Sequence, residues 1–335
     1  MPRLKRVTPY ESPGYRRRRN GDTFRYIGED GRTIGAAERT RVTALVIPPA
    51  WKRVWIADTP NAHILAVGID DAGRRQYIYH PRWRATQDGE KFAHARELAV
   101  ALPAARRRVT RDLRSTGLHK ERVLAAAFRL LDSTSIRVGA EEYARTNGSR
   151  GLSTLLCKHV KVDGTTISLS FPAKSNIDAS ISLIDTDLAA VVSELLKRPA
   201  KSRLLAWNDS DSATGTGGDR MIPVTAADVN DYIRSRTGGD FTAKDFRTLN
   251  GTLAAASALA DLGPAPGAKT AARNQREAVK AAADVLGNTP TVARSSYIDP
   301  TIWARYEEGE TIDGNVVPEK ALIQLIDGAS ENASA

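Results

Sequence analysis

The sequence predicts an α+β fold in two parts: a small N-terminal lobe built on an antiparallel β-sheet and a larger, mainly α-helical C-terminal lobe. Three observations lead to this prediction. Short β-rich runs separated by turn signals occupy residues 23–80. Helical periodicity takes over beyond about residue 90. One non-helical island, residues 151–185, has the pattern of a three-stranded meander within the helical lobe.

The length and the composition agree with two globular domains. A chain of 335 residues favours roughly two domains, and 41% hydrophobic residues are enough for a packed core. We place the β-rich N-terminal domain at residues 1–87 and the mainly helical domain at 88–335, with a hinge near residues 80–90. Residues 1–20 are polar, contain Pro and Gly, and carry the arginine run 16–19. They are expected to form a flexible basic arm, and a solvated tail without specific function is the alternative.

Five β-rich runs are expected to build the sheet of the N-terminal lobe. They are "TFRYIG" (23–28), "RVTALVI" (41–47), "KRVWIA" (52–57), "HILAVGID" (63–70) and "RQYIYH" (75–80). The turn signal "DDAGR" joins the last two runs into a hairpin. Its second strand alternates, with Gln76, Ile78 and His80 on one face and Tyr77 and Tyr79 on the other.

The C-terminal lobe shows apolar residues at helical spacing in several segments. These are residues 119–131, 188–197, 225–236, 242–261 and 270–286. Two segments begin with the Thr-x-x-Asp signal of a capping box, at Thr225 with Asp228 and at Thr242 with Asp245. The meander between these helices contains three β-rich runs, separated by "VDGT" and "KSNID".

The charge balance points to a polyanionic partner. The formal net charge is +10, which favours nucleic acid before a membrane surface. No apolar run is long enough for a transmembrane helix, and the first residues lack the apolar stretch of a secretory signal. The single Cys157 cannot form an intramolecular disulfide, which is typical of the reducing cytosol. The histidines show no zinc-site spacing, so no metal site is expected.

Tyr297, in "NTPTVARSSYIDP" (288–300), is a candidate nucleophile. A phenol is a weak nucleophile at neutral pH unless nearby cations or a base favour the phenolate. In a basic protein that binds nucleic acid, a phosphodiester is the electrophile. Arginines suit the non-bridging oxygens, because they stay charged and donate twice in one plane. A lysine could protonate the departing 5′-oxygen.

Three cations stand at suggestive places for such a site. Arg137 lies in "STSIRVGAEEYA", just after a predicted helix, and Arg247 lies in the first turns of a capped helix. Lys174 lies in "SFPAKSNIDA", at a predicted hairpin tip of the meander. Spacing alone does not bring these residues to Tyr297, so their convergence would have to come from the fold.

Six segments in the same order resemble the bacterial, poxvirus-like type IB DNA topoisomerases. They are "IPPAWKRVWI", "GRRQYIYHPRWR", "IRVGAEEY", "GLSTLLCKHV", "FTAKDFRT" and "LGNTPTVARSSYIDP". The resemblance runs from about residue 44 to about residue 305. It implies two lobes that form a clamp around duplex DNA. It also implies an ATP-independent isomerase that relaxes positive and negative supercoils through a 3′-phosphotyrosyl intermediate, strand rotation and religation.

The resemblance also implies roles for individual residues. Tyr297 would be the nucleophile, Arg137 and Arg247 would hold the scissile phosphate, and Lys174 would protonate the leaving 5′-hydroxyl. Asn288 stands where many members carry a histidine that donates to a non-bridging oxygen, and its amide can donate neutrally. A second interpretation makes Asn288 the N-cap of the helix that begins near "TPTV".

Further positions match DNA contacts of the family. These are Gln76, Tyr77 and Tyr79 in the small lobe and Tyr143 and Lys244 in the large one. The chain departs from the family pattern at Ala173, where glycine is usual in the hairpin, and at Leu249, where an aromatic residue is frequent. Ordinary exposed strand residues remain the alternative for Gln76, Tyr77 and Tyr79.

The expected partner is double-stranded DNA, bound by a monomer that is cytoplasmic and nucleoid-associated. No cofactor is expected to be required, and Mg²⁺ is a candidate stimulator of DNA release. Two other functions stay open. Tyrosine recombinases and integrases use the same chemistry, but they usually place a histidine where this chain has Lys244. A non-catalytic DNA-binding protein on the same fold is the second alternative.

Overall fold

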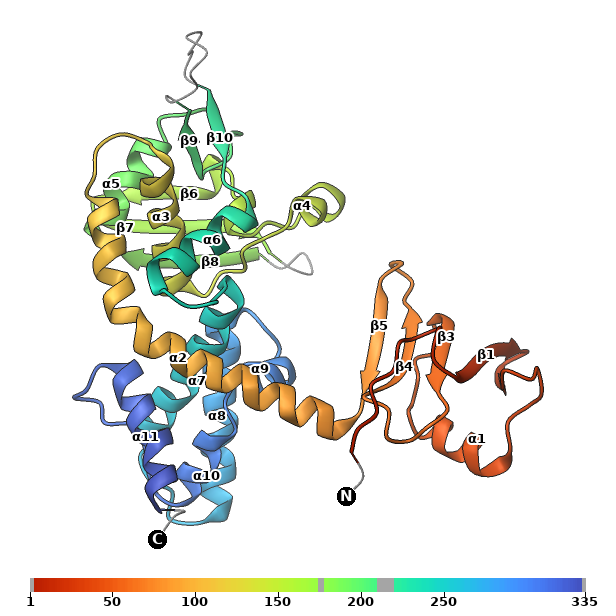
Figure 1. Ribbon diagram of the computed structural model, residues 1–335. Coiled ribbons are helices and arrows are strands. Elements are labelled where there is room, and N and C mark those ends of the chain that lie inside the picture. The colour runs from red at the N-terminus through yellow and green to blue at the C-terminus, as the bar shows by residue number, and fades with distance from the viewer. Residues whose placement is uncertain (1–2, 174–177, 210–219, 333–335) are drawn as a thin grey trace. The chain divides into compact units, whose positions relative to one another are not determined.

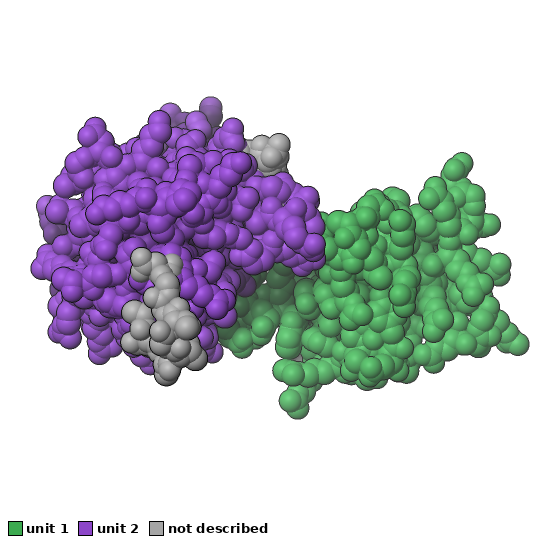
Figure 2. Space-filling view, turned by 90° about the horizontal axis from the view of Figure 1, so that it is seen from above, with its two compact units in different colours: residues 1–90 green, residues 91–335 purple. Residues whose placement is uncertain are grey.

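The structure is a computed structural model that describes residues 3–173, 178–209 and 220–332 (Figure 1). The chain folds into two compact units, residues 1–90 and residues 91–335, which Figure 2 shows in different colours. Helix α2, Pro81–Leu113, crosses the boundary between them. The segment 80–90, expected as a linker, is therefore largely helical. Pro81 suits the start of this helix, because its missing N–H would be unpaired there in any case.

A five-stranded antiparallel sheet forms the first unit, with the strand order β2-β1-β3-β4-β5. The strands are β1 Gly14–Asn20, β2 Thr23–Ile27, β3 Lys52–Ala57, β4 Ile64–Ile69 and β5 Arg75–Tyr79. The register pairs Trp55 with Val67 and Ile56 with Ala66. Successive residues point to opposite faces, so these two pairs belong to two separate buried clusters, one on each side of the sheet.

The arginine run belongs to this sheet rather than to a flexible arm. Gly14–Asn20 form β1, which pairs with both β2 and β3. Arg17 explains the difference from the sequence prediction, because its guanidinium packs over the ring of Phe24 at 4.1 Å. The same group donates to the carbonyls of Ile47 and Trp51 at 3.0 and 2.6 Å. Arg17 therefore holds strand β1 against the loop that contains Ile47 and Trp51.

Residues 41–47 also differ from the prediction of a strand. Helix α1, Ala36–Thr43, occupies the first part of this segment, followed by a turn. The helix-favouring residues at its start outweigh the β-branched residues that suggested a strand. Val42 is fully buried in the cluster that contains Ile56 and Ala66, so packing on the sheet stabilises the helix.

The second unit is mainly helical and confirms the α+β prediction, including the three-stranded meander. Its helices are α3 Lys120–Thr134, α4 Glu141–Asn147, α5 Thr186–Leu195, α6 Ala226–Thr237, α7 Ala243–Leu262, α8 Ala268–Leu286, α9 Pro290–Ser296, α10 Thr301–Glu307 and α11 Pro318–Asn332. Its strands are β6 Val160–Asp163, β7 Thr166–Pro172 and β8 Asp178–Ile184, paired in that order, and the short pair β9 Ala206–Asn208 and β10 Met221–Pro223.

Both predicted capping boxes are present. The carboxylate of Asp228 accepts the backbone N–H of Thr225 at 3.0 Å, and that of Asp245 accepts the N–H of Thr242 at 2.8 Å. These contacts satisfy N–H groups that a helix start leaves unpaired. They fix where α6 and α7 begin, and hence where Arg247 lies along α7.

Helix α3 forms the centre of the second unit. Most of its residues are buried, and the ring of Phe128 packs edge-to-face on Phe246 with ring centroids 5.2 Å apart. Phe246 precedes Arg247 on α7, so this contact fixes α7 against the C-terminal part of α3. Among the described ranges, no helix combines the length and the hydrophobicity that a membrane span needs.

Candidate active site

Arg137 lies in the loop that follows α3. Ser135 ends that helix in the left-handed region, with φ of 55°. The carbonyl of Arg137 accepts the N–H of Leu152 at 2.8 Å. Gly151 allows this approach, because a Cβ there would lie 2.6 Å from the carbonyl oxygen of Arg137. Two segments that resemble the family, "IRVGAEEY" and "GLSTLLCKHV", thus hold each other's backbone.

Arg247 joins three parts of the second unit. It lies in α7 and is only 5% exposed. Its Nη1 donates to the carbonyl of Ser135 at the end of α3, and its Nη2 donates to the carbonyl of Leu286 at the end of α8, at 2.9 Å. Its Nε is buried and has no hydrogen-bond partner in the described part of the chain. One N–H of an otherwise fixed guanidinium is therefore left without an acceptor among the described residues.

Asn288 follows the left-handed Gly287 that ends α8. Its side-chain Oδ1 accepts from Nη2 of Arg137. The N-cap of α9 is Thr289, whose hydroxyl accepts the N–H of Val292 at 3.4 Å, so the interpretation of Asn288 as the cap is wrong. The Nδ2 of Asn288 is buried and unpartnered among the residues described. A donor without a partner is costly inside a protein, so this amide also suits an incoming acceptor.

Tyr297 ends α9, and its ring lies beside Arg247. The Cζ atom of Arg247 is 5.1 Å from the ring centroid. The backbone of Tyr297 lies against α7, where Gly251 has no side chain to block it. A Cβ at Gly251 would lie 2.7 Å from the carbonyl oxygen of Tyr297 and 3.0 Å from its Cβ. The hydroxyl of Thr252 donates to the same carbonyl at 3.2 Å.

Arg137 lies close enough to Arg247 for its charge to act on the guanidinium of Arg247. Burial lowers the pKa of Arg247, and the charge of Arg137 lowers it further, whereas Tyr297 acts in the opposite direction. Two guanidinium groups in one partly buried site repel each other, so an anion between them is stabilising. The structure therefore brings together Arg137, Arg247, Asn288 and Tyr297 from four separate segments of the second unit.

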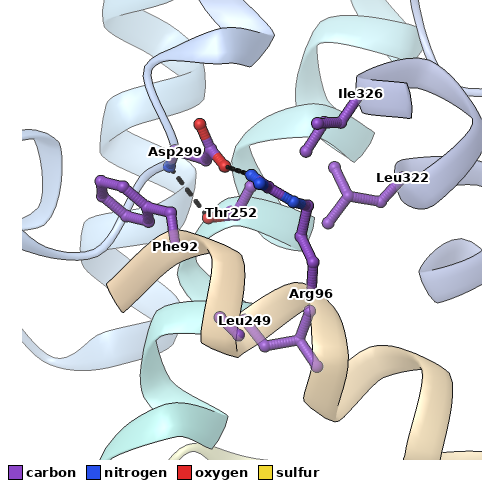
Figure 3. A pocket seen from close by; sticks show the side chains of 8 residues that line it. Phe92, Arg96, Leu249, Thr252, Asp299, Leu322 and Ile326 are labelled. Atoms are coloured by element: carbon purple, nitrogen blue, oxygen red, sulfur yellow. Dashed lines mark hydrogen bonds and ion pairs between the residues drawn. The ribbon is translucent and has the colours of Figure 1, made fainter. Parts of the chain in front are cut away.

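An ion pair between Arg96 and Asp299 fixes the turn that follows Tyr297 in the sequence (Figure 3). Asp299 is 3% exposed and accepts from Nη1 of Arg96 at 2.7 Å. Its backbone N–H donates to the hydroxyl of Thr252 at 3.0 Å, and its Oδ1 accepts the N–H of Thr301 at 2.9 Å. Sequence reasoning missed Thr252, Asp299 and Arg96 as supports of the site. Only the position of Thr252, somewhat more than one helical turn after Arg247, could have suggested a role.

The remaining predicted site residues lie in different places. Lys244 is exposed in the first turn of α7, three residues before Arg247. Tyr143 lies in α4, and Lys174 falls outside the described residues. In the first unit, the exposed rings of Tyr77 and Tyr79 stack on β5 with centroids 5.7 Å apart. Gln76 on the opposite face donates to Asp70 at 2.9 Å.

Comparison with known proteins gives two family matches. A family model for the catalytic core of eukaryotic DNA topoisomerase I matches residues 80–310, and one for the N-terminal domain of bacterial DNA topoisomerase IB matches residues 23–70. The chain is 32% identical over 289 residues to DNA topoisomerase 1B of Acanthamoeba polyphaga mimivirus, covering 85% of each. It is 26% identical over 222 residues to DNA topoisomerase 1 of Mycosarcoma maydis, covering 62% of this chain and 22% of that protein.

Proposed function

Because the chain belongs to the type IB DNA topoisomerases, a family of isomerases, we propose that it relaxes positively and negatively supercoiled DNA by cutting and resealing one strand. The observation that supports this most strongly is the convergence of Tyr297 with Arg137, Arg247 and Asn288. These four residues come from distant segments of the chain. Local structure alone therefore does not explain why they lie together.

In the proposed cycle, duplex DNA first places a backbone phosphate between the two arginines. The net charge of +10 favours this step through phosphate neutralisation, so binding weakens with salt. The unpartnered Nε of Arg247 and Nδ2 of Asn288 supply hydrogen-bond donors for non-bridging oxygens. Both donor atoms are buried in the structure, so a phosphate reaches them only after neighbouring side chains move.

The phenol of Tyr297 then gives up its proton to solvent, and its oxygen attacks the phosphorus. The bond from phosphorus to Tyr297 forms as the bond to the 5′-oxygen breaks, which gives a 3′-phosphotyrosyl link and a free 5′-hydroxyl. Arg137 and Arg247 stabilise the charge that grows on the non-bridging oxygens. We assign the proton for the leaving 5′-oxygen to Lys174, on the basis of the family resemblance.

Strand rotation and resealing complete the cycle. The cut strand turns about the intact one, and torsion of either sign is released. The 5′-hydroxyl then attacks the phosphotyrosine and restores the phosphodiester. The ester bond is retained in the protein–DNA link throughout, so no ATP is needed. We propose that the 1–87 and 88–335 domains act together as a clamp of one protein copy around bacterial DNA in the cytoplasm, at the nucleoid.

Plasmid relaxation without ATP or added metal tests this proposal, with the wild type and Tyr297→Phe compared on both torsional signs. We expect the wild type to relax both and to leave a denaturant-resistant protein–DNA adduct. Tyr297→Phe should do neither while still binding duplex DNA. An adduct without relaxation, together with recombination between two sites, would favour a recombinase. Binding with no adduct from the wild type would favour a non-catalytic protein.

A further inference from the structure

Helix α8 carries four basic residues on one face. Lys269, Arg273, Arg276 and Lys280 are spaced by four, three and four residues, which aligns them along the helix. All four side chains are exposed. Within the described ranges, none of them has an ion-pair or hydrogen-bond partner for its charged group. We call these four residues the α8 cation row.

The α8 cation row differs from most other helical arginines in the second unit, which are paired. Arg106 bonds Asp132 at 2.8 Å, and Arg129 bonds Asp185 at 2.6 Å. Helix α8 has acidic residues within helical reach of the row, at Glu277 and Asp284, but neither forms an ion pair among the residues that are described. Like charges three or four residues apart destabilise a helix by about 0.2–0.5 kcal/mol per pair. The row therefore has a local cost that an anionic partner would remove.

The opposite face of α8 is fixed to the core. Asn274 donates to the hydroxyl of Tyr306 at 2.7 Å, and Gln275 donates to Glu307 at 3.0 Å, both in α10. Val279 is buried in the main hydrophobic cluster. The row thus stands on a rigid helix, so its charges are presented at fixed spacing.

The C-terminal end of the same helix forms part of the active site. Leu286 accepts from Arg247, and Asn288 follows two residues later. With a rise of 1.5 Å per residue, Lys280 lies about 9 Å and Lys269 about 26 Å along the axis from Leu286. The row therefore spans about 17 Å, the length of roughly five base pairs at 3.4 Å each.

We infer that the α8 cation row binds the phosphate backbone of the duplex whose scissile phosphate lies at Tyr297, some base pairs away from the reacting phosphate. This inference rests on the proposed function, because that function puts a long, regular polyanion at the end of α8. That duplex carries negative charge, opposite to the charge of the α8 cation row. Helix α8 connects the row rigidly to the active site. These contacts raise affinity without reading base sequence.

A binding experiment in the non-cleaving Tyr297→Phe background tests the inference. In one variant, all four residues of the α8 cation row are changed to Gln. A matched control replaces four exposed lysines elsewhere in the second unit with Gln, so both lose four positive charges. The control lysines are Lys158, Lys161, Lys197 and Lys201. The affinity for one long linear duplex is measured over a series of salt concentrations.

We expect the slope of log affinity against log salt to become shallower by roughly 3.6 for the row variant, since each of four phosphate contacts contributes about 0.9. The control should change the slope by less than about 1. An unchanged slope for the row variant, or equal changes in both variants, would overturn the inference.

Folding and catalysis are checked separately. The thermal midpoint of the row variant should stay level or rise, because repulsion within α8 is relieved. If the fourfold variant does not fold, Arg276→Gln and Lys280→Gln are measured singly, and each should reduce the slope by about 0.9; no reduction in either would overturn the inference. Adduct formation by the wild type tests the proposed function itself. If the wild type forms no adduct, the proposed function is wrong, but the comparison of DNA affinities still tests the role of the α8 cation row.

Discussion

The hydroxyl of Thr252 lies 3.2 Å from the carbonyl oxygen of Tyr297. The same hydroxyl accepts the N–H of Asp299 at 3.0 Å, so one side chain of α7 holds the backbone on both sides of Ile298. Arg247 lies on that helix five residues earlier. A single helix therefore positions both the proposed nucleophile and one of the groups that would bind the phosphate.

Thr252→Val tests whether this contact positions Tyr297. The variant keeps the shape of the side chain but removes the bonds to Tyr297 and Asp299, together with the bond from the hydroxyl to the carbonyl of Thr248 on α7 itself at 3.1 Å. We expect DNA affinity to stay close to that of the wild type while the rate of adduct formation falls about 10-fold to 100-fold, because small misplacements of a reacting group are costly. Single-turnover cleavage at saturating protein measures this rate.

Thr252→Ser is the matched control, because it restores the hydroxyl without the methyl group. Its cleavage rate should recover most of the loss. A Val variant that cleaves as fast as the wild type would show that Tyr297 is held by other contacts.

Gly251→Ala gives opposite expectations from sequence and from structure. In the interior of a helix, Ala is more favourable than Gly by about 1 kcal/mol. At this position, however, the new Cβ would lie 2.7 Å from the carbonyl oxygen of Tyr297 and 2.9 Å from a methyl group of Leu286. We expect a lower thermal midpoint and a cleavage rate reduced at least 10-fold, because Tyr297 has to move away from α7. A raised midpoint with full cleavage would contradict the observed packing.

The sequence predicted those elements whose local signals agree with their packing. The capping boxes at Thr225 and Thr242 placed the starts of α6 and α7 correctly, because local hydrogen bonds determine them. Strand β1 was missed because its arginines look like a solvated run. Only the fold reveals that Arg17 bonds the carbonyls of a distant loop.

The candidate site likewise combines features that the sequence predicts with features that only tertiary packing determines. Residue chemistry made Tyr297, Arg137 and Arg247 candidates, and the family resemblance assigned their roles. Their meeting depends on how α3, α7 and α9 pack, which spacing cannot give. Thr252 could not be recognised from sequence, since its role comes from contact with the backbone of a segment 45 residues away. Side chains that support a site through backbone contacts leave no chemical pattern in a single sequence.

Arg96→Met tests the ion pair between Arg96 and Asp299. It leaves Asp299 buried without its guanidinium partner, so we expect the free energy of unfolding to fall by about 3 kcal/mol. The double variant Arg96→Met with Asp299→Asn removes the charge as well and should recover part of the loss. Denaturant unfolding of the wild type, both single variants and the double variant gives the coupling energy. Purely additive effects would show that the two side chains do not stabilise each other.

Arg247→Lys tests the need for a planar guanidinium. Two of its nitrogens hold the ends of α3 and α8, and its Nε remains for a ligand. An ammonium group keeps the charge but cannot make these contacts together. We expect adduct formation to fall about 100-fold or more, with duplex binding changed much less. Lys197→Arg, at an exposed lysine outside the site, is the control for altered cation type, and a wild-type rate in Arg247→Lys would argue against the geometry.

Asn288→His tests the neutral donor of the site through pH. The amide of asparagine does not titrate, whereas histidine has an unperturbed pKa of about 6.5. Arg137 is its direct neighbour and favours the neutral ring, so protonation should require a pH below that value. The cationic form stabilises the phosphate more strongly. We therefore expect the ratio of variant to wild-type cleavage rates to rise as pH falls from about 8 to about 5.5.

Two further variants separate this role from a structural one. Asn288→Asp retains an acceptor for Arg137 but repels the phosphate, so its cleavage rate should fall roughly 100-fold. Asn288→Ala should lower the thermal midpoint only through the loss of its bond to Arg137, because Thr289 and not Asn288 caps α9. A flat pH ratio for Asn288→His, combined with near-normal cleavage by Asn288→Asp, would mean that position 288 does not contact the reacting phosphate.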